Sequence, residues 1–304
     1  MNHIPPSESP SVAIVHPARF TVGESIVWSA GHEALFFVDI IGRTINAFRP
    51  ATGAIESWAT PEFATCIGLR RDGGFIVGLN RRVALWEPGA AFETLAVPEP
   101  DLPDNRLNEG AVAPDGSFWV GTMQTNLEPD GLPRNQSAAS GAYYRISPHG
   151  AVERLTPNAY GITNTMAWLD DGRFVTADTI ANTFYAFDRD SRGGLSGRRI
   201  FHTGFPRGLP DGSCVDAAGH IWNCRVVDGA CLVRFAPDGT VDRVVELPCA
   251  WPTSCAFGGP DLATLYITSA RFTMSPERLA ANFREGALMA LSVGVCGREP
   301  NRFG

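Results

Sequence analysis

A six-bladed β-propeller with four-stranded blades is the all-β fold class that this 304-residue sequence predicts. A unit of strand, tight turn and strand recurs six times, beginning GESIVWS, TCIGLRR, LNEGAVA, ITNTMAW, LPDGSCV and PTSCAFG. Repeats of this length with several strands each are typical of propeller blades, because one blade is too thin to bury its own face. Successive copies are spaced by 42, 42, 56, 47 and 42 residues when aligned at Glu24, Cys66, Asn108, Asn164, Asp211 and Thr253.

A second pair of strands follows the recurring unit in most copies. Period-two alternation bounded by Pro, Asp and Gly marks these half-buried strands. They are clearest in residues 44–60, 141–156, 182–203 and 230–248. Two hairpins per copy give four strands per blade, and six copies give six blades. We expect one domain over residues 1–304, in which residues 1–10 form a flexible N-terminal tail.

Three segments depart from the repeat. The last copy lacks one strand, and the spare apolar stretch at residues 11–20 is expected to pair with it, closing the ring and removing an open sheet edge. The third copy carries a polar insertion at 124–140, which predicts loops over one face. Residues 275–286 predict a short helix with Ser275 as N-cap and Pro276 at its first position.

Composition excludes several classes of partner. The net charge is −7 and the basic residues are scattered, which argues against nucleic acid, since that partner needs clustered Lys and Arg. No apolar run approaches the ~18 residues of a membrane span. The N-terminus shows neither the basic nor the apolar region of a secretory signal. Seven cysteines, an odd number, suit reduced structural thiols, so we expect a cytoplasmic protein.

Oxygen-bearing side chains occupy four of the six aligned positions: Glu24, Asn108, Asn164 and Asp211. Equivalent positions of propeller blades converge at one mouth of the central channel. Two carboxylates placed so closely would repel each other unless a cation lay between them. Oxygen ligands suit Ca²⁺, Mg²⁺ or Mn²⁺, and Zn²⁺ or Fe²⁺ also accept carboxylates. The pattern therefore predicts one divalent metal ion, although each residue taken alone is also typical of a capped turn.

Other catalytic patterns are missing. The sequence has no Gly-x-Ser-x-Gly motif, which disfavours a serine hydrolase of the elbow type. Its six histidines show no paired spacing, and no Gly-x-Gly-x-x-Gly opens a predicted helix. Any chemistry is therefore expected to depend on the metal.

The chain resembles the senescence marker protein / gluconolactonase / luciferin-regenerating enzyme family. The matching motifs occur in the family's order between about residues 20 and 295. They are Gly23-Glu24-Ser25-Ile-Val-Trp28, Phe37-Val-Asp39-Ile, Arg106-Leu-Asn108-Glu109-Gly110, Asp115-Gly-Ser-Phe-Trp119-Val-Gly-Thr-Met123, Ile162-Thr-Asn164, Gly208-Leu-Pro-Asp211-Gly212 and Pro252-Thr-Ser-Cys-Ala-Phe-Gly-Gly.

This resemblance implies a six-bladed propeller with one catalytic divalent metal in the central channel. By position, Glu24, Asn164 and Asp211 match the metal ligands of the family. Arg106 and Asn108 match its substrate-contacting pair. The substrate that the resemblance implies is a small sugar-acid lactone, opened by hydrolysis.

The sequence departs from the family pattern at three places. Ser25 and Thr165 stand where glycine is usual, and Glu109 stands where aspartate is usual. All three changes keep the implied ligands, so they bear on substrate preference more than on catalysis. Gln124 and Asn126 begin the insertion and are expected to line the pocket.

The expected roles follow from the chemistry of each side chain. Asp211 would act as general base on the attacking water. Arg106 would bind substrate oxygens through its planar fork of donors, and Asn108 would read a hydroxyl group. Glu109 would either hold Arg106 or make an outer contact to substrate. A metal-dependent esterase or organophosphate hydrolase, and a non-catalytic Ca²⁺-binding propeller, remain alternatives.

Overall fold

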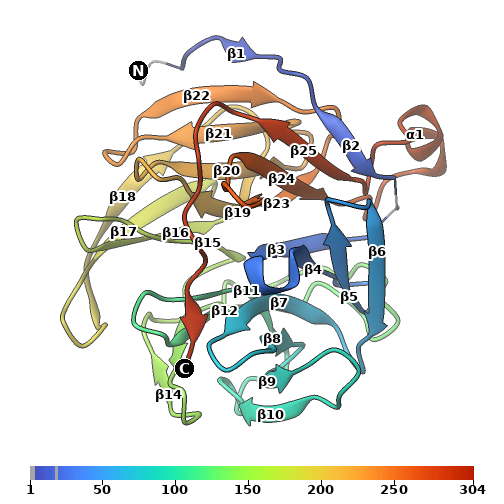
Figure 1. The fold of residues 1–304 in the computed structure, drawn as a ribbon. Coiled ribbons are helices and arrows are strands. Elements are labelled where there is room, and N and C mark those ends of the chain that lie inside the picture. The colour runs from blue at the N-terminus through green and yellow to red at the C-terminus, as the bar shows by residue number, and fades with distance from the viewer. Residues whose placement is uncertain (1–3, 18–19) are drawn as a thin grey trace.

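The computed structural model describes residues 4–17 and 20–304, which form six small sheets arranged as the blades of a β-propeller (Figure 1). This confirms the predicted fold class and the four-stranded blades. Three blades consist of four consecutive antiparallel strands. Blade 1 contains β3 (Gly23–Ser29), β4 (Ala34–Asp39), β5 (Thr44–Arg49) and β6 (Ala54–Ala59); blade 3 contains β11 (Asn105–Val112), β12 (Phe118–Gln124), β13 (Tyr143–Ile146) and β14 (Val152–Arg154); blade 4 contains β15 (Thr163–Trp168), β16 (Arg173–Asp178), β17 (Thr183–Arg189) and β18 (Leu195–Thr203).

The other three blades take a strand from a chain end. Blade 2 contains β7 (Ala64–Arg70), β8 (Phe75–Leu79), β9 (Arg82–Trp86) and β10 (Glu93–Ala96), with β26 (Arg302–Phe303) beside β7. Blade 5 contains β19 (Leu209–Val215), β20 (Ile221–Val226), β21 (Cys231–Phe235) and β22 (Val241–Glu246), with β1 (Ser7–Glu8) beside β22. Blade 6 contains β23 (Pro252–Gly258), β24 (Thr264–Ser269), β25 (Leu288–Ser292) and β2 (Ala13–His16).

The N-terminal segment closes the ring as the sequence predicts. Strand β2 pairs antiparallel with β25, with Ala13 opposite Ala290. Residues 1–10 are expected as a flexible tail; residues 1–3 of this stretch lie outside the described part of the chain, and within residues 4–10 strand β1 pairs parallel with β22. The side chain of Arg243 binds Glu8 with an N–O distance of 2.6 Å. This ion pair and the short ladder attach the segment to blade 5.

The C-terminal segment crosses one face of the ring and ends beside β7 (Figure 1). Arg298 binds Asp170 of blade 4 at 2.6 Å, and the Asn301 side chain donates to the carbonyl of Val112 at 3.0 Å. The Phe303 side chain is buried. The segment lies at the end of the channel where the inner strands finish, which we call the lower channel. A cavity of about 270 Å³ there is lined by the inner strands and by residues 298–301.

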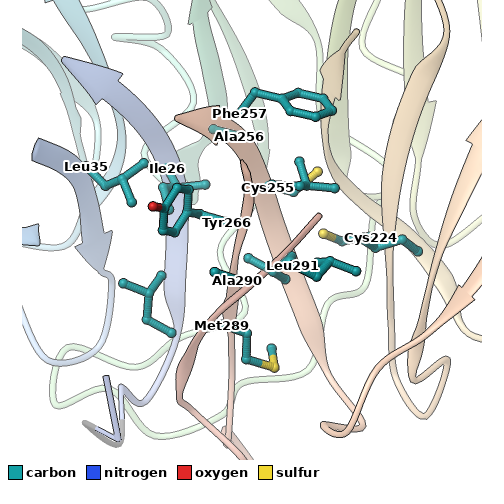
Figure 2. Close-up of a cluster of buried hydrophobic side chains, with 14 of the residues drawn as sticks. Ile26, Leu35, Cys224, Cys255, Ala256, Phe257, Tyr266, Met289, Ala290 and Leu291 are labelled. Carbon is teal, nitrogen blue, oxygen red and sulfur yellow. The ribbon is translucent and has the colours of Figure 1, made fainter. Parts of the chain in front are cut away.

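The apolar core lies between neighbouring blades. Every residue of β4 is buried, whereas every residue of the outer strand β14 is exposed. Aromatic rings join the blades, as Phe36 and Phe75 do with ring centroids 4.3 Å apart. Such pairs contribute beyond the area that they bury. Figure 2 shows the cluster where blades 5, 6 and 1 meet, with the sulfur atoms of Cys224 and Cys255 turned toward each other.

Helical structure is sparse. The predicted short helix is α1 (Pro276–Ala281), and the Ser275 side chain accepts a hydrogen bond from the backbone N–H of Arg278, as an N-cap should. A 3-10 turn, η1 (Ala30–His32), joins β3 to β4. No helix in the described part of the chain has the length and apolar character needed to cross a membrane.

Candidate metal centre and substrate pocket

The six inner strands share a register irregularity near their first residues. In β19 the pairing slips between Pro210 and Ser213, which leaves Asp211 outside the regular ladder. In β7 the slip lies between Ala64 and Cys66, so Thr65 takes the place that alignment gave to Cys66. Bulges of this kind bend a strand and re-aim its side chains. They turn the aligned residues toward the channel.

Glu24 on β3 and Asp211 on β19 are brought together at the mouth of the channel where the inner strands begin. Their carboxyl groups are close enough to share a hydrogen bond. The Glu24 carboxylate also accepts the N–H of Ser25 at 2.8 Å. Asp211 is only 7% exposed. Burial, and then repulsion between carboxylates, raises the pKa of both groups well above their ordinary values. Without a cation, the pair therefore tends to hold a proton.

Asn164 on β15 is fixed beside this pair. Its side chain is 4% exposed, and its amide nitrogen donates to the Thr179 hydroxyl at 2.8 Å. Thr179 donates in turn to the carbonyl of Pro210 at 2.8 Å, next to Asp211. With its nitrogen engaged, the amide presents its oxygen as the remaining ligand atom.

Glu109 on β11 adds a third carboxylate near this pair, close enough to act on it by its charge. Its charge raises the pKa of both Glu24 and Asp211. Burial raises the pKa of Glu109 itself to about 7, although the N–H of Gly110 donates to its carboxylate at 3.0 Å and opposes this change. Glu109 also lines the cavity in the lower channel. It thus lies between the ring of candidate ligands and that cavity.

Arg106 on β11 is a buried cation, 5% exposed, whose described partners are all neutral. Its guanidinium donates to the carbonyl of Leu107 at 2.8 Å, the Asn108 side chain at 2.8 Å and the Asn126 side chain at 2.9 Å. Burial lowers its pKa to about 10, and the nearby Glu24 carboxylate opposes this change. Among the described residues, no ion pair joins Arg106 to Glu109. Its fork is held in place mainly by amides.

A divalent cation fits the donor set. Two carboxylates and one amide oxygen are hard ligands, and the raised pKa values mark a site where negative charge lacks compensation. Within residues 4–17 and 20–304, no group of three His, Cys, Asp or Glu side chains has an arrangement able to hold a metal ion. The candidate ligand set differs in composition from such a group, because the amide of Asn164 supplies one of its three members.

The sequence predicts which side chains gather at the channel mouth, but it does not predict the residues that hold them in position. Thr179, which fixes Asn164, lies outside the aligned motifs. Gln124 is expected in the pocket from sequence, but its side-chain oxygen accepts the N–H of Ser137 at 2.6 Å and ties the insertion to β12. Asn126 does reach the site. The residues after two ligands, Ser25 (φ 52°) and Thr165 (φ 59°), adopt left-handed backbone, which their departure from glycine could have signalled.

Comparisons with known proteins agree with the fold. A family model described as the SMP-30/Gluconolactonase/LRE-like region matches residues 22–271. The chain is 34% identical over 281 residues to a 6-deoxy-6-sulfogluconolactonase of Pseudomonas putida, covering 91% of this chain and 92% of the relative. It is 34% identical over 284 residues to regucalcin of Danio rerio, covering 92% and 93%.

A solved structure is also similar. It is a regucalcin from Agrobacterium tumefaciens, described as a calcium-binding protein. The TM-score is 0.88 at 26% identity, and the match covers 97% of this chain and 98% of that one. The likeness therefore extends over the whole ring of blades.

Proposed function

We propose that this chain, which belongs to the SMP-30/Gluconolactonase/LRE-like family, is a metal-dependent hydrolase that opens the ester ring of a sugar-acid lactone to give the aldonic acid. One observation carries the proposal: the buried carboxyl group of Asp211 and the half-buried carboxyl group of Glu24 meet beside the amide of Asn164 at the mouth of the channel. A folded protein keeps such an arrangement at a cost in stability, which is expected of a functional site.

Glu24, Asn164 and Asp211 would hold the metal ion. When bound, the metal would supply Lewis-acid polarisation of the ester carbonyl and stabilise negative charge on its oxygen. The similar protein from Agrobacterium is called calcium-binding, which makes Ca²⁺ the first ion to test, before Zn²⁺, Mn²⁺, Mg²⁺ and Fe²⁺.

Asp211 would also be the catalytic base that takes a proton from the attacking water. Its backbone is fixed from two sides, since the Thr165 hydroxyl and the Asn223 amide donate to its carbonyl oxygen at 2.8 and 2.9 Å. A base held in this way needs little reorganisation as the proton moves. Glu109 would make an outer contact to the substrate or its water.

Arg106 and Asn108 would orient the lactone. The Asn108 side chain accepts from Arg106 and donates to the carbonyl of Thr163 at 2.8 Å, so both groups are fixed before substrate arrives. A guanidinium with neutral partners suits electron-rich or anionic substituents. The name of the Pseudomonas relative points to a sulfonated aldonolactone, and we include that class among the candidate substrates.

A pH-indicator assay tests the proposal. Metal-stripped protein would be offered hexonic, pentonic and sulfonated aldonolactones, with each divalent metal added back in turn. We expect acid release that requires metal and is absent from Asp211→Asn. Metal binding without release from any lactone, aryl ester or organophosphate would favour a non-catalytic calcium-binding propeller, and release from the last two alone would favour an esterase or organophosphate hydrolase.

A further inference from the structure

The insertion of blade 3 forms the roof of a second cavity, separate from the lower channel. This cavity has a volume of about 270 Å³. Its walls come from loops of blades 1, 2 and 3, and its lining includes Arg43, Phe63, Asn80, Arg81, Asn105 and Arg134. The insertion therefore reaches over blade 2 to blade 1.

Specific contacts hold this roof in place. The Arg43 guanidinium donates to the backbone carbonyl of Pro129. A Cβ atom added to Gly131, whose φ is +89°, would lie 3.0 Å from the Ile41 side chain. At the other end, the guanidinium of Arg134 binds both carboxylate oxygens of Asp104, at 2.9 and 3.0 Å. The cavity is thus built by packing and hydrogen bonds along the insertion.

Two guanidinium groups in the lining have no carboxylate partner among the described ion pairs. Arg43 lies over the ring of Phe63, 4.7 Å from its centroid, in addition to its bond to a carbonyl. Arg81 donates to the backbone carbonyls of Glu99 and Pro100 at 3.2 and 3.4 Å, and its Nε is buried without a hydrogen-bond partner. Both positive charges therefore remain uncompensated.

The acidic residues of the lining are already neutralised. Asp104 is paired with Arg134, and Glu62 accepts from Arg82 at 2.7 Å. The cavity is left with an excess of positive charge in a protein whose net charge is −7. Such a local reversal concentrates anions from solution.

We propose that this cavity binds an oxyanion group of phosphate or sulfate chemistry, either as the inorganic ion or as part of a small metabolite. Guanidinium forks match the paired oxygens of these anions, and Arg43 and Arg81 approach from neighbouring blades.

The proposed anion site adjoins, along the chain, the residues proposed to orient the lactone. Asn105, Thr125 and Leu127 line the cavity. Arg106 directly follows Asn105 in the chain, and Asn126 lies between Thr125 and Leu127. The side chains of Arg106 and Asn126 are hydrogen-bonded to each other at the candidate lactone site. An anion that fixes the insertion would therefore also fix Asn126, and through it the guanidinium that orients substrate.

Sulfate binding to the metal-loaded protein tests this inference. Thermal unfolding would be followed over millimolar sodium sulfate against sodium chloride at matched ionic strength, for the wild type and for Arg43→Gln and Arg81→Gln. Arg199→Gln, which removes the same charge from an exposed ion pair on blade 4, is the matched control. We expect a saturable rise in Tm with sulfate, and an apparent Kd weakened about tenfold in either cavity variant but unchanged in the control.

A rise that does not saturate, or that persists equally in both cavity variants, would overturn the proposal, because general exclusion of sulfate also stabilises proteins. Phosphate and a sugar phosphate, compared in the same titration, distinguish an inorganic ion from a metabolite. The binding test uses no lactone, so it succeeds or fails independently of the proposed activity.

Discussion

The hydroxyl of Thr165 donates a hydrogen bond to the backbone carbonyl of Asp211 at 2.8 Å. Thr165 follows Asn164 in the chain, so this bond joins the strands that carry two of the three candidate ligands. Ser25, which follows Glu24, makes a related contact by accepting the N–H of Ile67 at 2.9 Å. Both residues have left-handed backbone, which is unfavourable for a β-branched threonine. The hydroxyl bonds offset that strain.

Substitutions of Thr165 should distinguish the effect of its hydroxyl hydrogen bond from the effect of its side-chain volume. Thr165→Val keeps the volume but loses the hydroxyl, and we expect metal affinity to fall several-fold and stability to fall by about 1 kcal/mol. Thr165→Ser keeps the hydroxyl and should retain both. Isothermal titration with Ca²⁺ and urea unfolding measure the two effects, and equal affinity in Val and Ser variants would show that the bond has no positioning role.

The carboxylate pair should make metal-free protein less stable than a neutralised variant. Glu24→Gln removes one of two charges whose burial raises the pKa of both groups. We expect it to raise the Tm of the metal-free protein by a few degrees. Saturating metal should reverse the order, because only the wild type then gains binding free energy.

Differential scanning calorimetry with chelator and with added metal measures this crossover. Glu56→Gln, at an exposed surface ion pair, is the control for loss of a carboxylate. A Glu24→Gln protein that is less stable than the wild type under both conditions would contradict a charge conflict at the site.

The repeat explains why much of this architecture could be predicted from sequence. The alignment of the six repeats shows which strand of each copy lines the channel. Glu24, Asn164 and Asp211 occupy equivalent positions in these strands, so they are expected to meet. Alignment could not place Thr179, because it acts through a side-chain bond to Asn164 from outside the inner strand. Nor does periodicity predict β26, a two-residue strand held by contacts distant in sequence.

Stability of the metal-free protein should also fall as pH rises. The pKa of Glu109 is about 7 in the fold and 4.5 ordinarily, so between these values the folded protein holds a proton that the unfolded chain has released. The folded state therefore loses relative stability from about pH 4.5 to about pH 7. The raised pKa values of Glu24 and Asp211 act in the same direction.

Urea unfolding across this range, with and without metal, measures the dependence. Bound metal should reduce the slope, since the cation compensates the carboxylates in place of protons. Glu109→Gln should remove part of the slope in the chelated protein. Stability that rises steadily over the same interval in chelator would show that these carboxyls are not desolvated as described.

Asn126 gives a test of charge preference in the proposed lactonase. Its amide oxygen accepts from Arg106 at 2.9 Å, so Asn126→Asp would place a carboxylate against the guanidinium with little change in shape. We expect KM to rise about tenfold for a sulfonated lactone and much less for an uncharged one, with kcat little changed. Steady-state kinetics on both substrates measure the difference, and equal changes in KM would mean that Arg106 does not recognise substrate charge.

The C-terminal segment should stabilise the ring without taking part in catalysis. Phe303 is 4% exposed and packs among residues of blades 2 and 3, and Arg71 donates its N–H to the Phe303 carbonyl at 2.9 Å. Phe303→Ala should therefore cost about 3 to 5 kcal/mol of unfolding free energy. The segment lies at the end of the channel opposite the ligands, so kcat of the folded fraction should be unchanged.

Phe283→Ala, at an exposed phenylalanine, is the matched control for Phe303→Ala and should cost little unfolding free energy. Urea unfolding and activity on the same samples measure both effects, and a loss of kcat at full folding would place the segment in the catalytic machinery.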